Sequence, residues 1–391
     1  MQTNKNKILF IAPLPPAYNG QTKVSQAVLE VLNSDKNNTV TIVNSIKKGL
    51  TNGIDSFERI VIVLGILKRI WQNRKNKDII YLSLTQSTSG NIKDLITYCM
   101  CYKSLDKMVL QMLGGAGMTE IINKNNFISS INKYFQKRAK AIVVEGNQNF
   151  ELFTKYINPD KVHILPNFVD EYVFTDTQSI QNKFKSIEKI NLLYLSNLLP
   201  GKGYWELANA FIEIDEKLRS NFNLSFVGGF PNTVSEREFL ELIAPYKNIT
   251  YLGKFIDGEA KKELYAKSHI FCLPTYYPYE GQPISILEGY ASGMVVMTTN
   301  HSGIPTIFKD KTNGYLVEKQ SKDAIKIALK KIYQERITLE NTAVSNFEEA
   351  KEKYNITRYK NKIYQIILDK KLAIIFIIEN ALSQDFVQNV V

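Results

Sequence analysis

The sequence predicts an α/β protein made of two doubly wound domains. Short apolar runs that suit buried strands alternate along the chain with longer segments that suit helices. The alternation reaches Pro166, pauses in a loop and starts again at Asn191. A length of 391 residues with 44% hydrophobic residues is enough for two such domains, each with its own core. Because successive parallel strands need a crossover, usually a helix, the alternation indicates a parallel sheet in each domain.

In the first half of the chain, the apolar runs predict strands at 7–12, 39–44, 78–84, 108–113, 141–144 and 162–165. Helices are expected between them at 24–32, 57–71, 93–102, 131–139 and 149–156. Gly20 lies in the first strand-to-helix loop. A glycine there either lets a ligand approach the backbone closely or serves an ordinary turn, and both interpretations stand.

The positive charge of the chain is concentrated in this half. Residues 1–165 carry 22 Lys and Arg against 11 Asp and Glu, whereas the remainder carries 27 against 27. A basic surface can bind nucleic acid, anionic lipid or a phosphorylated acceptor. No nucleic-acid motif accompanies the charge, so we predict contact with an anionic membrane, with a merely basic soluble surface as the alternative. The segment 57–71 is apolar on more than one face and suits either a membrane-interface helix or an ordinary helix covering a sheet.

The composition also limits cofactors and location. Three cysteines, Cys99, Cys101 and Cys272, together with three histidines, give neither a disulfide framework nor a zinc pattern. The chain shows no secretory signal and no run of 18 apolar residues. We therefore expect a cytoplasmic protein with no metal site and no transmembrane helix.

The second half repeats the alternation. Strands are predicted at 191–195, 224–227, 249–252, 270–273 and 294–297. Helices are predicted at 204–218, 260–268, 283–292 and 322–335, with one or two more in 341–369. The tail, 370–391, contains a short apolar run that is too short to span a bilayer.

Two glutamates flank the start of the helix predicted at 283–292. Glu280 lies in the preceding loop, and Glu288 projects near the apolar face of the helix, where an unpaired carboxylate would be costly. Between them, Gly281 permits close approach of a ligand, and the first helical amides suit a phosphate. This combination fits a sugar nucleotide, although each glutamate could also be solvated or paired with a lysine.

Lys202 stands just before the helix predicted at 204–218, where a cation is electrostatically unfavourable. A bound diphosphate would remove that conflict, while a lone lysine at this place could simply be solvated.

These residues resemble the donor-site signature of the retaining glycosyltransferases of family 4, the group 1 glycosyltransferases of bacterial polysaccharide biosynthesis. The signature is Glu280-Gly281-x-Pro283, then Leu287-Glu288 with seven residues between the glutamates, then Gly303-Ile304-Pro305 and Asn313-Gly314. The resemblance implies the GT-B architecture, with two Rossmann-like domains facing each other across a cleft. It implies an acceptor-binding domain at 1–166, a nucleotide-sugar-binding domain at 167–354, and a helix at 355–391 that crosses back to the first domain and ends in the tail.

The resemblance also implies roles for individual residues. Glu280 and Lys202 would be catalytic. The donor would be bound by Glu288, Gly20, Gly281, Gln282, Pro283, Ile284, Asn197 and Ile256. The chain departs from the family pattern twice: Leu113 stands where a histidine is usual, and Asn197 stands where an arginine is usual. Because Asn lacks the charged bidentate contact of Arg, Lys202 would carry more of the diphosphate.

The implied activity is metal-independent retaining transfer from a nucleoside diphosphate sugar, UDP- or GDP-linked, with no cofactor. The implied acceptor is a glycan or lipid-linked oligosaccharide in the synthesis of a surface polysaccharide such as O antigen or capsule. This places the protein at the inner face of the plasma membrane as a peripheral protein. Two alternatives are a UDP-sugar 2-epimerase-like enzyme and a catalytically degenerate nucleotide-sugar-binding protein.

Overall fold

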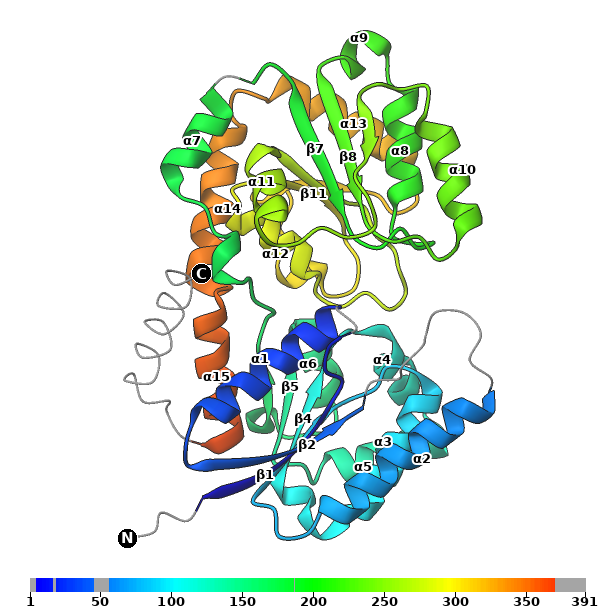
Figure 1. Ribbon diagram of the computed structural model, residues 1–391, viewed down its shortest axis with the longest axis vertical. Coiled ribbons are helices and arrows are strands. Elements are labelled where there is room, and N and C mark those ends of the chain that lie inside the picture. The colour runs from blue at the N-terminus through cyan, green and yellow to red at the C-terminus, as the bar shows by residue number, and fades with distance from the viewer. Residues whose placement is uncertain (1–4, 17–18, 46–55, 186, 370–391) are drawn as a thin grey trace. The chain divides into compact units, whose positions relative to one another are not determined.

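The computed structural model describes residues 5–16, 19–45, 56–185 and 187–369, and the chain divides into two compact units (Figure 1). The first unit contains the chain up to Pro166 together with the segment that starts at Ile356, and the second unit is Asn167–Asn355. The tail predicted at 370–391 lies outside the described residues.

The first domain is built on a sheet of six parallel strands in the order β2-β1-β3-β4-β5-β6. The strands are β1 (Asn6–Ala12), β2 (Asn38–Asn44), β3 (Ile79–Ser83), β4 (Met108–Met112), β5 (Ala141–Val144) and β6 (Val162–Ile164). The inner strands β3, β4 and β5 are buried along their whole length. Such runs form without alternation because helices cover both faces of a parallel sheet.

The helices of this domain form two layers. They are α1 (Gly20–Ser34), α2 (Ser56–Asn73), α3 (Thr88–Met100), α4 (Ala116–Asn123), α5 (Phe127–Gln136), α6 (Asn147–Thr154) and α15 (Ile356–Leu368). From β1 the chain moves to β2 at one edge of the sheet and then crosses back past β1 to β3. Because such crossovers are right-handed, this reversal places α1 on one face of the sheet and α2, α3 and α5 on the other face. The contacts agree, because α1 packs on α15 while α2 packs on α3 and α3 on α5 (Figure 1).

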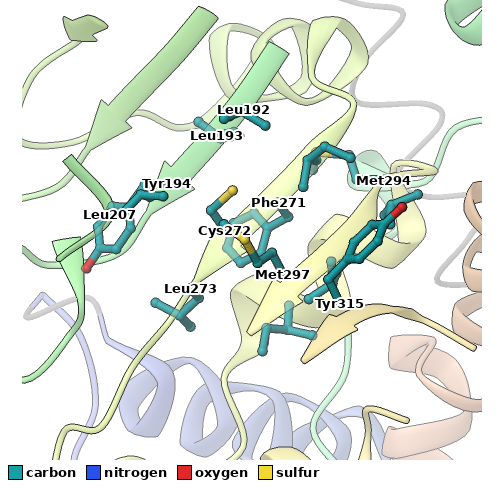
Figure 2. Close-up of a cluster of buried hydrophobic side chains, with 14 of the residues drawn as sticks. Leu192, Leu193, Tyr194, Leu207, Phe271, Cys272, Leu273, Met294, Met297 and Tyr315 are labelled. Carbon is teal, nitrogen blue, oxygen red and sulfur yellow. The ribbon is translucent and has the colours of Figure 1, made fainter. Parts of the chain in front are cut away.

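The second domain has the same construction, with strand order β12-β11-β10-β7-β8-β9, all parallel. Its strands are β7 (Ile190–Leu195), β8 (Phe222–Val227), β9 (Ile249–Tyr251), β10 (Ile270–Leu273), β11 (Val295–Thr299) and β12 (Gly314–Val317). Its helices are α7 (Thr177–Lys185), α8 (Tyr204–Glu213), α9 (Glu216–Arg219), α10 (Thr233–Ile243), α11 (Gly258–Lys267), α12 (Ile284–Ala291), α13 (Lys322–Gln334) and α14 (Leu339–Lys353). Figure 2 shows part of its core, where Leu193, Phe271 and Met297 gather around β7, β10 and β11.

The prediction of two doubly wound α/β domains is confirmed, with local differences. The helix expected at 204–218 is interrupted, because Ile214 adopts an extended conformation and Asp215 then caps a separate helix, α9. The segment 341–369 forms two helices, α14 and α15. The elements that were not predicted are β12, α4, α7 and α10. In the described part of the chain, no helix has the length and apolarity required to cross a membrane.

Candidate active site

The topology of the second sheet marks where a ligand would bind. From β7 the chain moves outward through β8 and β9, then returns to β10 on the other side and moves through β11 to β12. The strand order therefore reverses between β7 and β10, which pair directly. In open α/β sheets, ligands bind outside the carboxyl ends of the strands at such a reversal. The loop after β7 carries Lys202, and the loop after β10 carries Glu280.

These two side chains form an ion pair. The Lys202 ammonium lies 3.0 Å from Glu280 Oε1 and 2.8 Å from Oε2. Only 13% of the Lys202 side chain and 8% of the Glu280 side chain are exposed. The Thr275 hydroxyl, fully buried, donates to Glu280 Oε2 at 2.9 Å. The Tyr277 ring lies 5.0 Å from the ammonium, a distance at which a ring attracts a cation.

The backbone of both loops is held in place by short hydrogen bonds. The Tyr276 N–H donates to the Gly201 carbonyl at 2.7 Å, which joins the loop after β10 to the loop after β7. His301 Nε2 lies 2.8 Å from the Tyr277 carbonyl, and the Ser302 hydroxyl donates to the Glu280 carbonyl at 2.5 Å. The His301 side chain therefore holds the loop in place by bonding to the backbone of Tyr277.

Gly203 lets the two loops approach. Its φ is +77°, and a Cβ at this position would lie 2.1 Å from the Pro274 carbonyl oxygen. Only glycine fits both the left-handed conformation and that approach. The close contact places the start of α8 beside the strand end that leads to Glu280.

Glu288 is buried within α12 and has its own partners. Its Oε1 accepts from the Lys261 ammonium at 2.9 Å, and its Oε2 accepts from the Tyr265 hydroxyl at 2.8 Å. The Glu288 residue is 3% exposed. Burial, and after it the Glu288 carboxylate, raises the pKa of Tyr265 well above its usual range, so the hydroxyl keeps the proton that it donates. Lys261 and Tyr265 lie one turn apart on α11, and sequence reasoning missed both.

The start of α12 presents backbone amides near Glu280. The helix begins at Ile284, and Pro283 is its N-cap residue, one position earlier than a first-turn proline, with no side chain capping the amides. Gly281 is partly exposed, and its carbonyl accepts from the Gly303 N–H at 3.3 Å. An uncapped helix N-terminus of this kind suits an anion.

Gln282, predicted to bind the donor, has a buried side chain that bonds within the second domain. Its Oε1 accepts from the Asn167 N–H at 2.6 Å, and its carbonyl accepts from the Asn167 side-chain amide at 2.8 Å. Gln282 is 3% exposed. Its side chain therefore anchors the segment that enters the second domain.

The remaining predicted residues are Asn197, Ile256 and Gly20. Asn197 is exposed in the loop after β7, and the Tyr194 hydroxyl donates to its carbonyl at 3.2 Å. Ile256 is half-buried and packs against the core of the second domain. Gly20 is exposed and begins α1 in the first domain, after an Asn19 cap. Leu113, where the family pattern has a histidine, is buried in the first domain.

Comparison with known proteins agrees with this fold. Residues 176–353 match the family of glycosyl transferases group 1. A UDP-Gal:alpha-D-GlcNAc-diphosphoundecaprenol alpha-1,3-galactosyltransferase from Escherichia coli is 22% identical over 60% of this chain and 61% of that protein. An N-acetyl-alpha-D-glucosaminyl L-malate synthase from Bacillus anthracis is 25% identical over 67% of this chain and 69% of that protein. The chain therefore aligns with only about three fifths of the galactosyltransferase.

Among solved structures, Anabaena HepE in complex with UDP matches with a TM-score of 0.67, over 93% of this chain and 100% of that one, at 13% identity. The fold and site thus define a two-domain α/β protein with the GT-B fold. The match to the family of glycosyl transferases group 1 lies within the second domain, at residues 176–353.

Proposed function

We propose that the protein is a retaining glycosyltransferase that transfers a sugar from a nucleoside diphosphate sugar, UDP- or GDP-linked, to a glycan acceptor. The observation that carries the proposal is the largely buried Lys202–Glu280 pair at the strand reversal of the second sheet, beside the uncapped start of α12. A lysine and free helix amides stabilise a diphosphate, and a neighbouring carboxylate suits a sugar hydroxyl or a cationic sugar ring.

Charge development explains the role of each group. Breaking the bond between the sugar and the diphosphate leaves negative charge on the phosphate oxygen. An ammonium group has three N–H donors, so Lys202 can contact that oxygen while it stays bonded to Glu280. Glu280 and Thr275 thus hold Lys202 in position before the donor arrives, which makes its stabilisation of the leaving group preorganised. These groups would do the work that a metal ion does elsewhere, and the proposed transfer needs no metal and no cofactor.

Further roles follow the family pattern. We assign Glu288 to the ribose hydroxyls, with Lys261 and Tyr265 fixing its orientation. We assign retention of anomeric configuration to attack of the acceptor oxygen on the anomeric carbon from the same face that the diphosphate leaves. The acceptor proton passes to the leaving phosphate, so no protein nucleophile is needed.

The acceptor that we propose is a lipid-linked oligosaccharide diphosphate used in the synthesis of a bacterial surface polysaccharide. Support comes from the name of the Escherichia coli relative, whose acceptor is a sugar diphosphoundecaprenol. The excess of positive charge in residues 1–165 also fits an anionic lipid acceptor at the inner face of the plasma membrane.

The test is a thermal-shift titration with UDP, GDP, ADP and their sugars, with and without a chelator. A ligand at one hundred times its dissociation constant stabilises the folded state by about 2.7 kcal/mol. We expect one nucleotide to stabilise the wild type equally with and without chelator, and the Lys202→Ala variant to respond much less. Lys353→Ala is the matched control, because Lys353 pairs with Glu349 at 3.0 Å on the exposed surface of the same domain.

Sugar release from the responding donor then separates the remaining possibilities. Transfer to a sugar diphosphate lipid supports the proposal. Conversion of the donor sugar to its epimer without acceptor indicates an epimerase, and binding without turnover indicates a nucleotide-sugar-binding protein; either result would refute the proposed transfer.

A further inference from the structure

The exposed large apolar side chains of the first domain are confined to some of its elements. In the described part of that domain, every large hydrophobic side chain that is exposed lies on β2, α2, α3, α5 or the short helical turn Tyr102–Lys107. None lies on α1, α4, α6 or α15 within the described residues. The principal members are Ile60, Leu64, Trp71, Ile92, Phe127 and Tyr134. We call this surface the α2–α3–α5 face, and Figure 1 shows these helices in one layer.

Packing among the described residues of the domain leaves these side chains exposed. Helix α2 packs against the core through Ile66 and Ile70, which lie on its inner side. On its outer side, Ile60, Leu64 and Trp71 are 56%, 59% and 54% exposed. Phe127 on α5 is 79% exposed. Helix α3 contacts both α2 and α5, so these side chains lie on neighbouring helices, and an exposed apolar surface of this kind marks an interaction site in soluble proteins.

The charge near the C-terminal end of α2 is mostly positive, although the sequence has Glu58 in the first turn of the helix and Asp78 after it. From Ile60 to Lys77 the chain carries five Lys and Arg residues and no Asp or Glu. Two of the aromatic rings also have an arginine guanidinium over their face. The Arg74 guanidinium lies 3.2 Å from the centre of the Trp71 ring, and the Arg138 guanidinium lies 3.6 Å from the centre of the Tyr134 ring. The Tyr134 and Tyr102 hydroxyls are 2.9 Å apart at the surface. Rings with a polar edge and a neighbouring cation suit the headgroup region of a bilayer.

We propose that the α2–α3–α5 face docks on the surface of an anionic phospholipid bilayer, with α2 lying along the interface. The apolar side chains would enter the acyl boundary, and the basic residues would contact lipid phosphates. A second copy of the chain fits this face less well, because two such surfaces would place like charges against each other. The inference rests on the membrane acceptor of the proposed function and gives it a physical location on the protein.

The test is flotation of the full-length chain with vesicles of phosphatidylcholine, alone and with phosphatidylglycerol added. We expect strong binding only to the anionic vesicles. Raising the salt to about 1 M shortens the screening length from about 10 Å to about 3 Å and should release most of the protein. Each basic residue near the surface contributes about 1 kcal/mol, so Lys68→Ala should weaken binding about fivefold.

Matched substitutions separate the face from general surface effects. Leu64→Glu and Phe127→Glu should each reduce vesicle binding at least tenfold, since each replaces an inserted apolar group with a charge. Ile327→Glu and Ile337→Glu are the controls, because these second-domain side chains are 70% and 84% exposed and lie outside the face. Both controls should bind vesicles as the wild type does. A thermal melt of each variant checks that it is folded.

Three results would overturn the proposal: equal flotation of Leu64→Glu and the wild type, equal binding to neutral and anionic vesicles, or a concentration-dependent dimer that Leu64→Glu abolishes while the wild type does not float. Stabilisation by UDP or GDP is measured separately and should be unchanged in Leu64→Glu. If nucleotides bind and vesicles do not, the docking proposal is refuted and the proposed donor site is retained. If vesicles bind and no nucleotide does, the proposed transfer fails instead.

Discussion

The buried pair of Lys261 and Glu288 allows a quantitative prediction. We consider Lys261→Met, which keeps the length and apolar stem of the side chain and removes its charge. The lysine is 9% exposed and Glu288 is 3% exposed, so little water is available to replace the lost partner. The carboxylate would keep the Tyr265 hydroxyl at 2.8 Å but lose the cation at 2.9 Å.

The expected loss of stability is large. Removing one partner of a buried ion pair costs about 3–5 kcal/mol, because the other charge is left uncompensated. For a domain of this size, each kcal/mol lowers Tm by about 2–4 °C, which gives a fall of about 6–20 °C. Glu288→Met should cost a similar amount. The double variant should recover much of the loss, since two apolar side chains of suitable volume can replace a buried pair.

The assay is thermal unfolding of the wild type, both single variants and the double variant, followed by donor titration of each folded protein. A coupling free energy of several kcal/mol in the double-mutant cycle is expected. If the two single losses are each below about 1 kcal/mol and simply add, the pair behaves as a solvent-screened surface contact and our account of Glu288 is refuted. If Glu288→Met binds the nucleotide as well as the wild type, the assignment of Glu288 to the ribose is refuted even when the stability result holds.

Three further predictions concern the second domain. Thr275→Val removes a hydrogen bond to the Glu280 carboxylate and should cost about 1.5–3 kcal/mol of stability and lower turnover, as measured by melts and a transfer assay; wild-type values in both would contradict the positioning role. Gly203→Ala should lower Tm by several degrees, while Gly229→Ala, whose Cβ would meet nothing closer than 3.8 Å, should not; equal melts would show that the loop contact is unimportant. Burial, and after it the Lys183 ammonium, lowers the pKa of His269 from 6.5 to about 4. Because the unfolded chain binds that proton at higher pH than the folded chain, stability should fall by about 3 kcal/mol as pH drops from 6.5 to 4, and His269→Gln should show a shallower decline in pH-dependent melts.

Much of the fold could be predicted because the signals are local. Runs such as Ile270–Leu273 are short, apolar and bounded by turn residues, so they predict a strand whatever the strand later packs against. The edge strand β12 was missed because Leu316 is exposed between the buried Tyr315 and Val317, and four residues are too few to show that alternation clearly. The break at Ile214 was missed because the apolar pattern continues through it, and only the cap at Asp215 separates the two helices.

The candidate site was predictable to a lesser extent. The spacing of Glu280 and Glu288 around a helix start identified both carboxylates and the anion-binding amides between them. It did not identify Thr275 or Lys261, because a threonine in a loop and a lysine on a helix are common and carry no signal until their partners are known. It also gave no sign that the Gln282 side chain holds Asn167, a contact between residues 115 positions apart.

The sequence by itself determined the two-domain α/β class, the family resemblance and the residue types of the candidate site, because periodicity, turn residues and motif spacing act over a few residues. Only the tertiary structure decided which groups meet. Lys202 and Glu280 are separated by 78 residues, and their contact depends on the pairing of β7 with β10. The outward direction of Leu64 on α2 likewise depends on which side of that helix the sheet covers. Contacts between distant residues are set by strand order and helix packing, and these are properties of the whole folded chain.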